Sequence, residues 1–385
     1  YVAELGLVAA RELGVTKVLI GRDTRESGKQ IETALANGLL AGGVSVELLG
    51  VVPTPAIAFL AAKRGCASAA ITASHNPYSD NGVKLFANGG VKLSDAQQDA
   101  IESHMTGSAT VPSASAAQVD LIGEYVSHIV GLFPVLAFAN IRVVLDCANG
   151  AMSEVAPEVF AQLGATVIVL NDRPTGKNIN DSCGATHPEV VSEAVRLHKA
   201  DLGLAFDGDG DRVIAVDHIG DVVDGDHLIA LAAVDLHKRG KLKSNSVAVT
   251  VMTNAGFHQA MEKAGINVIT TPVGDRNILV AFDEHGLVLG GEQSGHIIYR
   301  DHATTGDGLL AGAMLVDLVR REAQPLATLA RNAMTSLPQT LINIRVAQVV
   351  SNPAEQLAAE IAKATQQLNG VGRVLLRASG TEPVV

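Results

Sequence analysis

The sequence predicts an α/β fold with three related α/β domains that carry mixed sheets, followed by a smaller C-terminal α+β domain. One observation is a pattern of strand, polar turn, helix and strand that recurs at residues 16–50, 141–172 and 245–275. Another is the composition, with 47% apolar residues, 38 glycines and few aromatic side chains, which suits packed α/β layers joined by tight turns. At 385 residues, the chain is also too long for one hydrophobic core.

Each repeat begins with four or five apolar residues typical of a buried strand, followed by a polar turn. The helix that comes next ends near a glycine and leads into a strand rich in Val and Ile. Two strands joined by a helix of this length favour a parallel pair with a right-handed crossover. Identity between the copies is low, so the repeat is one of architecture.

Domain boundaries are predicted where the composition changes. A small polar stretch at 108–118 precedes the second repeat, the turn at Asp224 precedes the third, and the pattern changes to alternation after Pro338. A strand at 339–348, a helix at 353–368 and a strand at 372–377 then indicate the smaller unit. The predicted domains are residues 1–124, 125–227, 228–340 and 341–385.

Charge and hydropathy narrow the functional class. A formal net charge of −11 argues against a nucleic-acid partner, although local Arg and Lys clusters can still bind an anionic small molecule. No uncharged apolar stretch of membrane length occurs, and the opening residues form an amphipathic helix and not a signal peptide. The three cysteines lack a CxxC spacing, which indicates reduced thiols. We therefore expect a cytoplasmic protein without a membrane partner.

The strongest chemical motif is AFDGDGDRVIAVD at 205–217. Asp207, Asp209 and Asp211 alternate with glycines after an apolar strand, so their oxygens can face one hard cation. A calcium loop of the EF-hand type does not fit, because Arg212 stands where glycine is needed and His218 where glutamate is needed. Three carboxylates leave other coordination positions of the ion free, which predicts Mg²⁺ that also binds a phosphate oxygen.

The stretch ITASHNPYSDNGVKLF at 71–86 places Ser74 directly after a strand, where open α/β sheets carry reactive groups. We interpret Ser74 as a phosphoryl carrier, with Lys84 and a metal to neutralise the phosphate charge. A nucleophile paired with His75 is one alternative, although adjacent side chains rarely reach each other and no GxSxG elbow is present. A plain Asn-Pro turn is the other.

A third polar loop, GGEQSGHIIYR at 290–300, combines Glu292, Ser294 and His296. A carboxylate beside a hydroxyl suits the vicinal hydroxyls of a sugar, and His296 is a candidate general acid or base. A lone histidine is more often structural. The flanking glycines and the acid–hydroxyl pair favour the functional interpretation here.

The fourth motif is RASGTEP at 377–383, in which polar side chains and amides form a compact anion nest. Its alternative is a simple Ser-Gly turn. Two weaker stretches are GRDTR at 21–25, whose Arg22 and Arg25 either steer a phosphate or pair with nearby acids, and KNINDSCGATHPE at 177–189. The role of this second stretch cannot be predicted from its spacing.

Together the motifs resemble the α-D-phosphohexomutase family, enzymes of four domains around a central cleft that move phosphate between the 1- and 6-positions of a sugar. The resemblance covers the whole chain, and the serine loop and DGDGDR are highly specific to it. The stretches at 178–180, 183–189 and 291–296 are most similar to the bacterial branch that acts on glucosamine phosphates. Relative to the family, we expect that terminal segments of the natural protein are missing, which truncates the first and last domains.

This resemblance implies the interconversion of glucosamine 6-phosphate and glucosamine 1-phosphate, through a phosphoserine and a sugar 1,6-bisphosphate, on the way to UDP-N-acetylglucosamine and peptidoglycan. It implies one Mg²⁺ held by Ser74, Asp207, Asp209 and Asp211. The implied catalytic groups are Ser74, His75, Lys84, Arg212 and His296, and the implied substrate-binding groups are Arg22, Glu292, Ser294, Arg377, Ser379, Gly380 and Thr381.

Three other functions stay open on the sequence alone. A sibling mutase would act on mannose or glucose phosphates, and a magnesium-dependent phosphatase would use the triad for hydrolysis. A non-catalytic sensor would bind a sugar phosphate and leave Ser74 unphosphorylated. In every case the partner is a small phosphosugar, and a homodimer is a candidate assembly.

Overall fold

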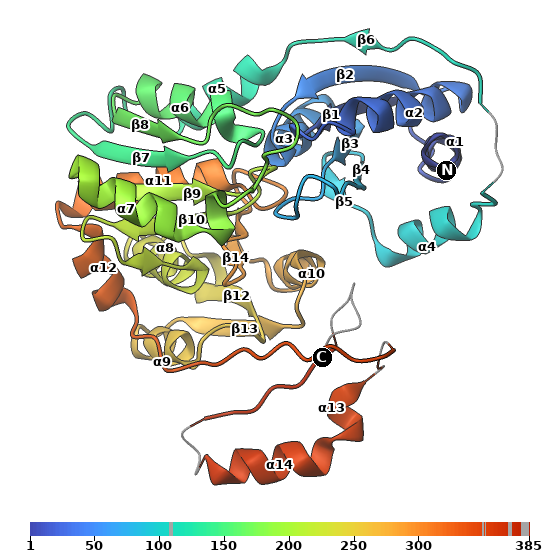
Figure 1. The fold of residues 1–385 in the computed structure, drawn as a ribbon. Coiled ribbons are helices and arrows are strands. Elements are labelled where there is room, and N and C mark those ends of the chain that lie inside the picture. Colours follow the sequence, from blue (N-terminus) through green and yellow to red (C-terminus); the bar gives the residue numbers. More distant parts are fainter. Residues whose placement is uncertain (108–110, 349, 351, 369–371, 379–384) are drawn as a thin grey trace. The chain divides into compact units, whose positions relative to one another are not determined.

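The structure is a computed structural model that describes residues 1–385 apart from 108–110, 349, 351, 369–371 and 379–384. The chain divides into two compact units (Figure 1). The first unit comprises residues 1–253 and 257–335, and the second comprises 254–256 and 336–385. Each unit is described by itself below.

The first unit contains three mixed sheets (Figure 1). The first sheet has the order β5-β4-β3-β1-β2-β6, the second β11-β10-β9-β7-β8, and the third β13-β12-β14-β15. The strands are β1 (Lys17–Arg22), β2 (Ser45–Val51), β3 (Ala67–Ile71), β4 (Val83–Ala87), β5 (Val91–Lys92), β6 (Ala117–Gln118), β7 (Arg142–Asp146), β8 (Thr166–Leu170), β9 (Leu202–Phe206), β10 (Val213–Asp217), β11 (Val222–Val223), β12 (Ser246–Thr250), β13 (Asn267–Thr271), β14 (Leu289–Gly291) and β15 (Ile297–Tyr299).

One four-strand arrangement occurs in all three sheets. Its first strand lies between the second and the third and is parallel to both, as in β2-β1-β3, β8-β7-β9 and β13-β12-β14. The fourth strand runs antiparallel beside the third, as β4, β10 and β15 do. The prediction of three related α/β domains with mixed sheets is therefore confirmed.

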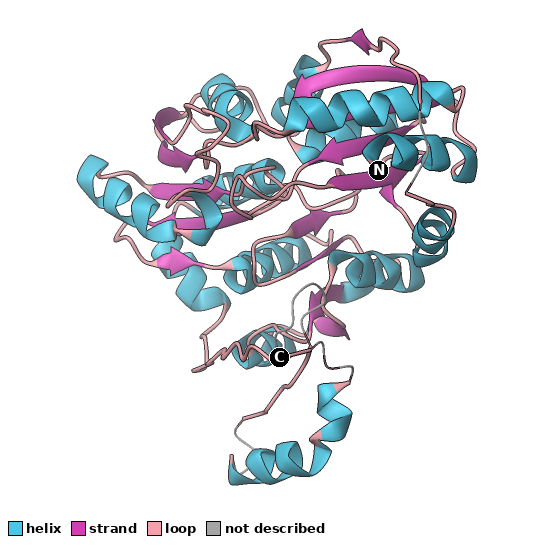
Figure 2. Cartoon of the chain, turned by 45° about the vertical axis from the view of Figure 1, so that its right-hand side comes forward, coloured by secondary structure: helices cyan, strands magenta, loops and turns pink. Residues whose placement is uncertain are grey.

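Helices pack along the strands of these sheets (Figure 2). Two helices in each repeat connect the three parallel strands, while the third strand passes to the fourth through a loop alone. The helices that lie wholly or mostly in the first unit are α1 (Val2–Glu12), α2 (Gly28–Ala41), α3 (Thr54–Arg64), α4 (Asp95–Ser103), α5 (Ile122–Gly131), α6 (Met152–Gln162), α7 (Pro188–His198), α8 (Gly225–Lys238), α9 (Ala255–Lys263), α10 (Asp275–His285), α11 (Gly308–Glu322) and α12 (Leu326–Ala333). Among the described residues, no helix has the length and apolar character needed to cross a membrane.

The central strand of each sheet is buried on both faces. In β1, Val18 and Ile20 pack into one core, and Leu19, between them, packs into another on the opposite face. Side chains alternate along a strand, so a strand covered on both sides reads as a continuous apolar run. The same alternation occurs in β7 and β12, and one large core joins the second and third sheets.

The second unit contains α13 (Pro353–Gln356) and α14 (Ala358–Gln367). The single helix predicted over 353–368 is interrupted at Leu357, whose backbone lies outside the helical region at φ −113° and ψ 26°. The predicted strands at 339–348 and 372–377 do not form in the described residues. Ile344 and Val385 exchange two backbone hydrogen bonds of 2.9 Å there.

Cys66, Cys147 and Cys183 are all buried and free, in agreement with the prediction of reduced thiols. Burial raises the pKa of Cys183 to about 12, against a smaller opposing effect from a hydrogen bond with Asn149. These thiols are therefore protonated at neutral pH and pack as small apolar side chains.

Candidate active site

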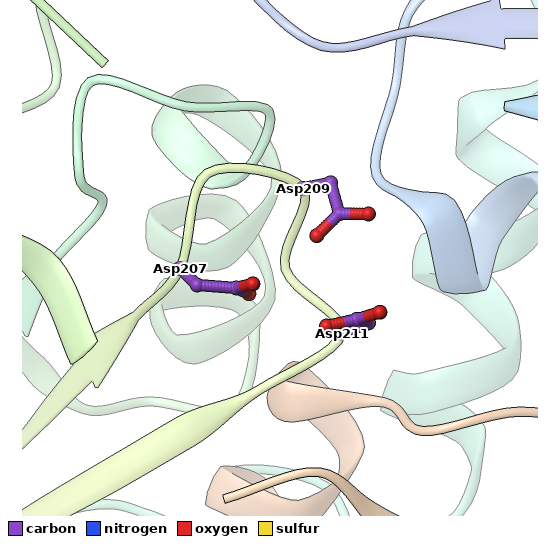
Figure 3. A group of neighbouring side chains, drawn as sticks. All are labelled: Asp207, Asp209 and Asp211. Atoms are coloured by element: carbon purple, nitrogen blue, oxygen red, sulfur yellow. The ribbon is translucent and has the colours of Figure 1, made fainter. Parts of the chain in front are cut away.

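The loop between β9 and β10 brings three carboxylates together. Asp207, Asp209 and Asp211 are each at most 5% exposed, and one oxygen from each lies within 4.8 Å of the others. Their carboxyl groups point into a common space beside the loop (Figure 3). The glycines between them let the chain curl, with Gly210 at φ +74°. The predicted triad therefore forms a single acidic cluster.

Opposing effects act on the charges of this cluster. Burial raises the pKa of Asp207 well above its ordinary value, and the charges of Asp211 and Asp209 raise it further. Burial also acts to raise the pKa of Asp211, but the charges of Lys84 and His296 outweigh it and hold that pKa well below its ordinary value. Three ionised carboxylates this close repel one another, so a further cation is needed to keep Asp207 ionised.

Ser74 lies against this triad from the neighbouring sheet. It follows β3, is 8% exposed, and its Oγ donates a hydrogen bond of 2.5 Å to Asp207 Oδ2. Its backbone has a φ of +51°, in the left-handed region, and its amide donates to Thr72 Oγ1 at 2.8 Å. The hydroxyl and the acidic cluster, which lie 133 residues apart in sequence, are thus parts of one site.

Two cationic side chains offset part of the negative charge of the triad. Lys84 on β4 places its Nζ 2.8 Å from Asp209 Oδ2 and 3.0 Å from Asp211 Oδ2. Burial acts to lower the pKa of Lys84, but these two carboxylates outweigh it and raise that pKa above its ordinary value. Arg212 Nε lies 3.9 Å from Asp211 Oδ1, and the backbone amide of Arg212 donates to Asp207 Oδ1 at 3.1 Å.

The loop between β14 and β15 contributes the third set of groups. His296 is buried, with Nδ1 3.7 Å from Asp211 Oδ2 and Nε2 3.3 Å from Asp275 Oδ2. Gly306 packs on the ring, and any side chain there would meet the ring atoms at 2.4–2.6 Å. Glu292 accepts a hydrogen bond of 3.0 Å from the amide of Gly274. His296 therefore contacts the acidic cluster directly.

The remaining predicted residues lie beside the triad, elsewhere in the chain, or outside the described residues. Ser294 is exposed on the third loop, and His75 is partly buried, with its pKa lowered by burial and by Arg212. Arg22 forms an ion pair of 3.5 Å with Glu32. Arg377 is exposed in the second unit, and the predicted phosphate-binding residues Ser379, Gly380 and Thr381 lie outside the described residues.

Three contacts at the site involve residues that the sequence interpretation did not single out. Thr54, at the start of α3, donates from Oγ1 to Asp209 Oδ2 at 2.7 Å, and its amide donates to the Asp209 carbonyl at 2.9 Å. Lys92 pairs with Asp275 at the start of α10. Thr54 and Asp275 could have been found from the sequence, because each is a polar residue at the start of a helix that follows a strand, in VPTP at 52–55 and VGD at 273–275.

The acidic cluster fits a divalent cation. Asp209 Oδ1 and Asp211 Oδ1 are buried and have no hydrogen-bond partner among the described residues. Asp207 Oδ2 is bonded to Ser74 Oγ. Hard carboxylate and hydroxyl oxygens with unused lone pairs are the ligands that Mg²⁺ prefers, whereas thiol or imidazole ligands would favour other metals.

Four family models match nearly the whole chain. They describe domains I, II and III of phosphoglucomutase/phosphomannomutase, at residues 1–111, 123–220 and 224–337, and the C-terminal domain at 341–385. A curated relative from Parafrankia sp. (strain EAN1pec), named phosphoglucosamine mutase, is 47% identical over 96% of this chain and 81% of its own. The chain belongs to the phosphoglucomutase/phosphomannomutase family. It is accordingly an isomerase that acts by intramolecular phosphoryl transfer.

Further relatives agree with this membership. Seven other bacterial proteins at 44–48% identity are also named phosphoglucosamine mutase. A crystal structure of a family member from Burkholderia thailandensis, 27% identical, matches with a TM-score of 0.79 over 93% of this chain and 80% of its own. The N-acetylphosphoglucosamine mutase of Aspergillus fumigatus, crystallised with GlcNAc-6P and magnesium, has the same fold at 18% identity, with a TM-score of 0.68 over 96% of this chain and 72% of its own.

Proposed function

We propose that the chain interconverts glucosamine 6-phosphate and glucosamine 1-phosphate, with Ser74 as the phosphoryl carrier. The observation that carries this proposal is the 2.5 Å contact between Ser74 Oγ and Asp207 within a buried triad. The relatives named phosphoglucosamine mutase support the choice of sugar. The product serves the synthesis of UDP-N-acetylglucosamine and peptidoglycan, in the cytoplasm.

The reaction exchanges one phosphate ester for another. Phospho-Ser74 loses its phosphoryl group to the free hydroxyl of the sugar phosphate, the Oγ–P bond breaks, and a new sugar O–P bond gives the 1,6-bisphosphate. The hydroxyl proton moves through the site to Ser74 Oγ. The bisphosphate then turns, its other sugar O–P bond breaks, and that phosphoryl group returns to Ser74 Oγ while the serine proton passes to the freed sugar oxygen. Uncatalysed phosphate monoester cleavage is so slow that accelerations of up to ~10²¹-fold are known.

Each group of residues has one task in this scheme. Ser74, Asp207, Asp209 and Asp211 would hold Mg²⁺, which when bound neutralises charge on the transferring phosphoryl group. Lys84 and Arg212 add fixed positive charge where the loose transition state needs it. His75 and His296 are the candidates for moving the proton, and His296 is already in contact with Asp211.

Substrate-binding tasks fall to the remaining predicted residues. Glu292 and Ser294 would contact the sugar hydroxyls, and Arg22 would steer a phosphate. Arg377, Ser379, Gly380 and Thr381 would hold the phosphate that is not reacting. We accordingly assign the phosphoserine to residues 1–124, the metal to 125–227, the sugar to 228–340 and the distal phosphate to 341–385.

A three-substrate assay tests the choice of reaction. The 6-phosphates of glucosamine, glucose and mannose are supplied separately with Mg²⁺ and glucose 1,6-bisphosphate as activator. We expect glucosamine 6-phosphate to be isomerised fastest, and Ser74→Ala to lose at least about 10³-fold in kcat because it lacks the carrier oxygen. The sugar assignment is wrong if glucosamine 6-phosphate is the poorest substrate.

Two other outcomes would replace the proposal. Release of inorganic phosphate without sugar 1-phosphate would indicate a phosphatase. Binding without any phosphorylation of Ser74, measured by intact mass spectrometry, would indicate a sensor. A homodimer remains a separate prediction, which light scattering after size-exclusion chromatography tests.

A further inference from the structure

The two weaker sequence stretches lie next to each other in the first unit. GRDTR at 21–25 belongs to the first sheet, and the polar loop around residues 173–181 belongs to the second. Thr24 Oγ1 donates to the carbonyl of Asn149 at 2.7 Å, and the amide of Glu26 donates to the carbonyl of Gly176 at 3.0 Å. The Glu26 amide and an ion pair of 3.3 Å between Lys177 Nζ and Glu26 Oε2 therefore join the two loops, and Thr24 joins the first of them to the turn after β7.

From these two stretches, two side chains reach the same two carbonyls of the serine loop. Arg25, from the same domain as Ser74, donates from Nη2 to the carbonyl of Ser74 at 3.1 Å and to that of Asn76 at 2.6 Å. Asn180, from the neighbouring domain, donates from Nδ2 to the carbonyl of Ser74 at 2.9 Å and to that of Asn76 at 3.1 Å. The loop is thus held from both sides.

Asn180 is itself firmly placed. It is 8% exposed, and its amide donates a hydrogen bond of 2.9 Å to the carbonyl of Ala148. Its φ of +56° lies in the left-handed region, which asparagine tolerates better than most residues. A side chain on Gly208, in the triad loop, would meet Asn180 Nδ2 at 2.8 Å and the Ser74 carbonyl at 2.7 Å. The amide of Asn180 therefore lies where the serine loop and the triad loop approach each other.

We propose that Asn180 is a positioning residue for phosphoryl transfer: its side-chain amide ties the Ser74 and Asn76 carbonyls to the domain of the triad and so holds Ser74 Oγ against the metal-binding carboxylates. This inference rests on the proposed function of Ser74. It deepens that function by assigning a task to the 178–180 segment. Arg25 acts on the same carbonyls from within the serine domain.

The physical reason lies in the unusual backbone of the serine loop. Ser74 has a left-handed φ, which non-glycine residues adopt only when the surroundings enforce it. Two donors on one carbonyl supply that enforcement, and one of them comes from the domain to which the hydroxyl must deliver its phosphate. Without Asn180, the Arg25 contacts remain and the loop stays folded. Its position relative to Asp207 is then fixed from one side only. Misplacement by about 1 Å can cost ~10²-fold in rate.

Asn180→Gly and Asn180→Asp test this role, because both replacements tolerate the left-handed backbone and neither can donate to the carbonyls. Asn178→Ala is the matched control. Asn178 lies two residues away in the same loop, and its side chain accepts from the Thr175 amide and donates to the Arg173 carbonyl, both within that loop. We expect kcat to fall by about 10- to 100-fold in both Asn180 variants, with KM for glucosamine 6-phosphate little changed.

The rate at which glucose 1,6-bisphosphate phosphorylates Ser74 in a single turnover should fall in parallel. The melting temperature and the Mg²⁺ concentration for half-maximal activity should stay near those of Asn178→Ala. The positioning role is overturned if kcat and the phosphorylation rate match the control, or if they fall only together with the melting temperature. A wild-type chain that neither isomerises the sugar nor becomes phosphorylated refutes the proposed function instead. The wild-type assay and the variant-to-control ratio therefore report on different claims.

Discussion

At the scale of single residues, Lys84 has the most direct electrostatic effect on the site. Its ammonium group lies within 3.0 Å of both Asp209 and Asp211, and it holds the pKa of Asp211 low against the effect of burial. A buried carboxylate pair that loses a close ammonium partner is left poorly compensated. In the absence of metal, Lys84 therefore offsets the repulsion within the triad.

Lys84→Met should lower the free energy of unfolding by about 3 kcal/mol at neutral pH without metal, as when one partner of a buried ion pair is removed. The same change should tighten Mg²⁺ binding, because the more negative cluster attracts a divalent cation more strongly. It should also lower kcat, since a fixed positive charge near the phosphoryl group is lost. Urea unfolding followed by circular dichroism and a Mg²⁺ titration measure the first two effects.

Lys17→Met is the control for this prediction. Lys17 forms a similar 2.7 Å ion pair with Glu47, but both side chains are more exposed and lie on β1 and β2. Loss of this ion pair should lower the free energy of unfolding by at most about 1 kcal/mol and leave Mg²⁺ binding unchanged. Weaker Mg²⁺ binding in Lys84→Met than in wild type would contradict the assigned role of Lys84.

At the scale of elements, the three reactive loops occupy equivalent positions. Residues 72–82, 207–212 and 292–296 each connect the third strand of a repeat to its antiparallel fourth strand. They carry Ser74, the triad, and Glu292 with His296. Open α/β sheets bind ligands at the carboxyl ends of their parallel strands. One site therefore forms where three copies of the same connection meet.

Close approach of two of these loops depends on Gly208. A side chain at this position would come within 2.6–2.8 Å of Ile179, the Ser74 carbonyl and Asn180. Gly208→Ala should separate the serine loop from the triad, and we expect kcat to fall about 100-fold. Stability should fall by about 1–3 kcal/mol, as overpacking does elsewhere. Steady-state kinetics and urea unfolding measure both effects.

Gly123→Ala provides the control, because nothing lies within 4 Å of a side chain built there and the residue is part of helix α5. Alanine is favoured over glycine in a helix, so this variant should be unchanged or up to about 1 kcal/mol more stable. Wild-type kcat in Gly208→Ala would mean that the two loops do not need their present separation.

The start of α11 contains a buried acid with a pH-dependent effect. Asp307 accepts a hydrogen bond from the amide of Leu310 at 2.9 Å and from the hydroxyl of Tyr125 at 2.8 Å. Burial raises the pKa of Asp307 to about 6, although these hydrogen bonds act to lower it. Between pH 4 and 6 the native chain therefore binds more protons at this residue than the unfolded chain does. Its contribution to stability falls as pH rises through this window.

Asp307→Asn removes this titration but keeps a side chain that can cap the helix and accept from Tyr125. Relative to wild type, the free energy of unfolding of the variant should rise by about 2–3 kcal/mol between pH 4 and pH 7 and change little below pH 4. Urea unfolding of both proteins across this range measures the difference. Parallel stability curves would contradict the raised pKa.

Asp224→Asn should show the opposite sign. Asp224 caps α8, and although burial acts to raise its pKa, hydrogen bonds from His227 lower it below the ordinary value. Its contribution to stability is therefore present above the ordinary pKa and is lost as pH falls. This variant should lose stability relative to wild type at neutral pH and approach it in acid.

Features of the fold and the site could be predicted from the sequence where they depend on a short stretch of residues. The apolar runs around Val18, Val144 and Ala248 predict buried strands because both of their faces are covered, and the alternation of Asp207 with glycine predicts an acidic cluster whatever surrounds it. Ser74 could be singled out because reactive groups follow strands in this type of sheet.

Contacts between distant segments could not be predicted in this way. Thr54 bonds to Asp209 and Asn180 bonds to the Ser74 carbonyl across more than 100 residues, and no local pattern specifies such pairs. Arg25 was recognised as a charged residue at a strand end, but its two carbonyl partners depend on the fold of the serine loop. The interrupted helix at Leu357 likewise follows from backbone geometry that the apolar pattern does not determine.

At the scale of the whole molecule, the first unit assembles one site from three sheets. Ser74 and Lys84 come from the first, the aspartates and Asn180 from the second, and His296 from the third. Backbone hydrogen bonds join these domains directly at the site, from Thr54 to Asp209 and from Val213 to Gly295. Such contacts let a hydroxyl and a metal cluster on different domains function as one centre.

Transfer of a labelled phosphoryl group tests this joint centre most directly. The chain is incubated with ³²P-labelled glucose 1,6-bisphosphate, with and without Mg²⁺, and the label is located by peptide mapping. We predict label on Ser74 alone, dependent on Mg²⁺, absent from Ser74→Ala and Asp209→Asn, and passed on to added glucosamine 6-phosphate. Label on another residue, or equal labelling in Asp209→Asn and without Mg²⁺, would contradict the account.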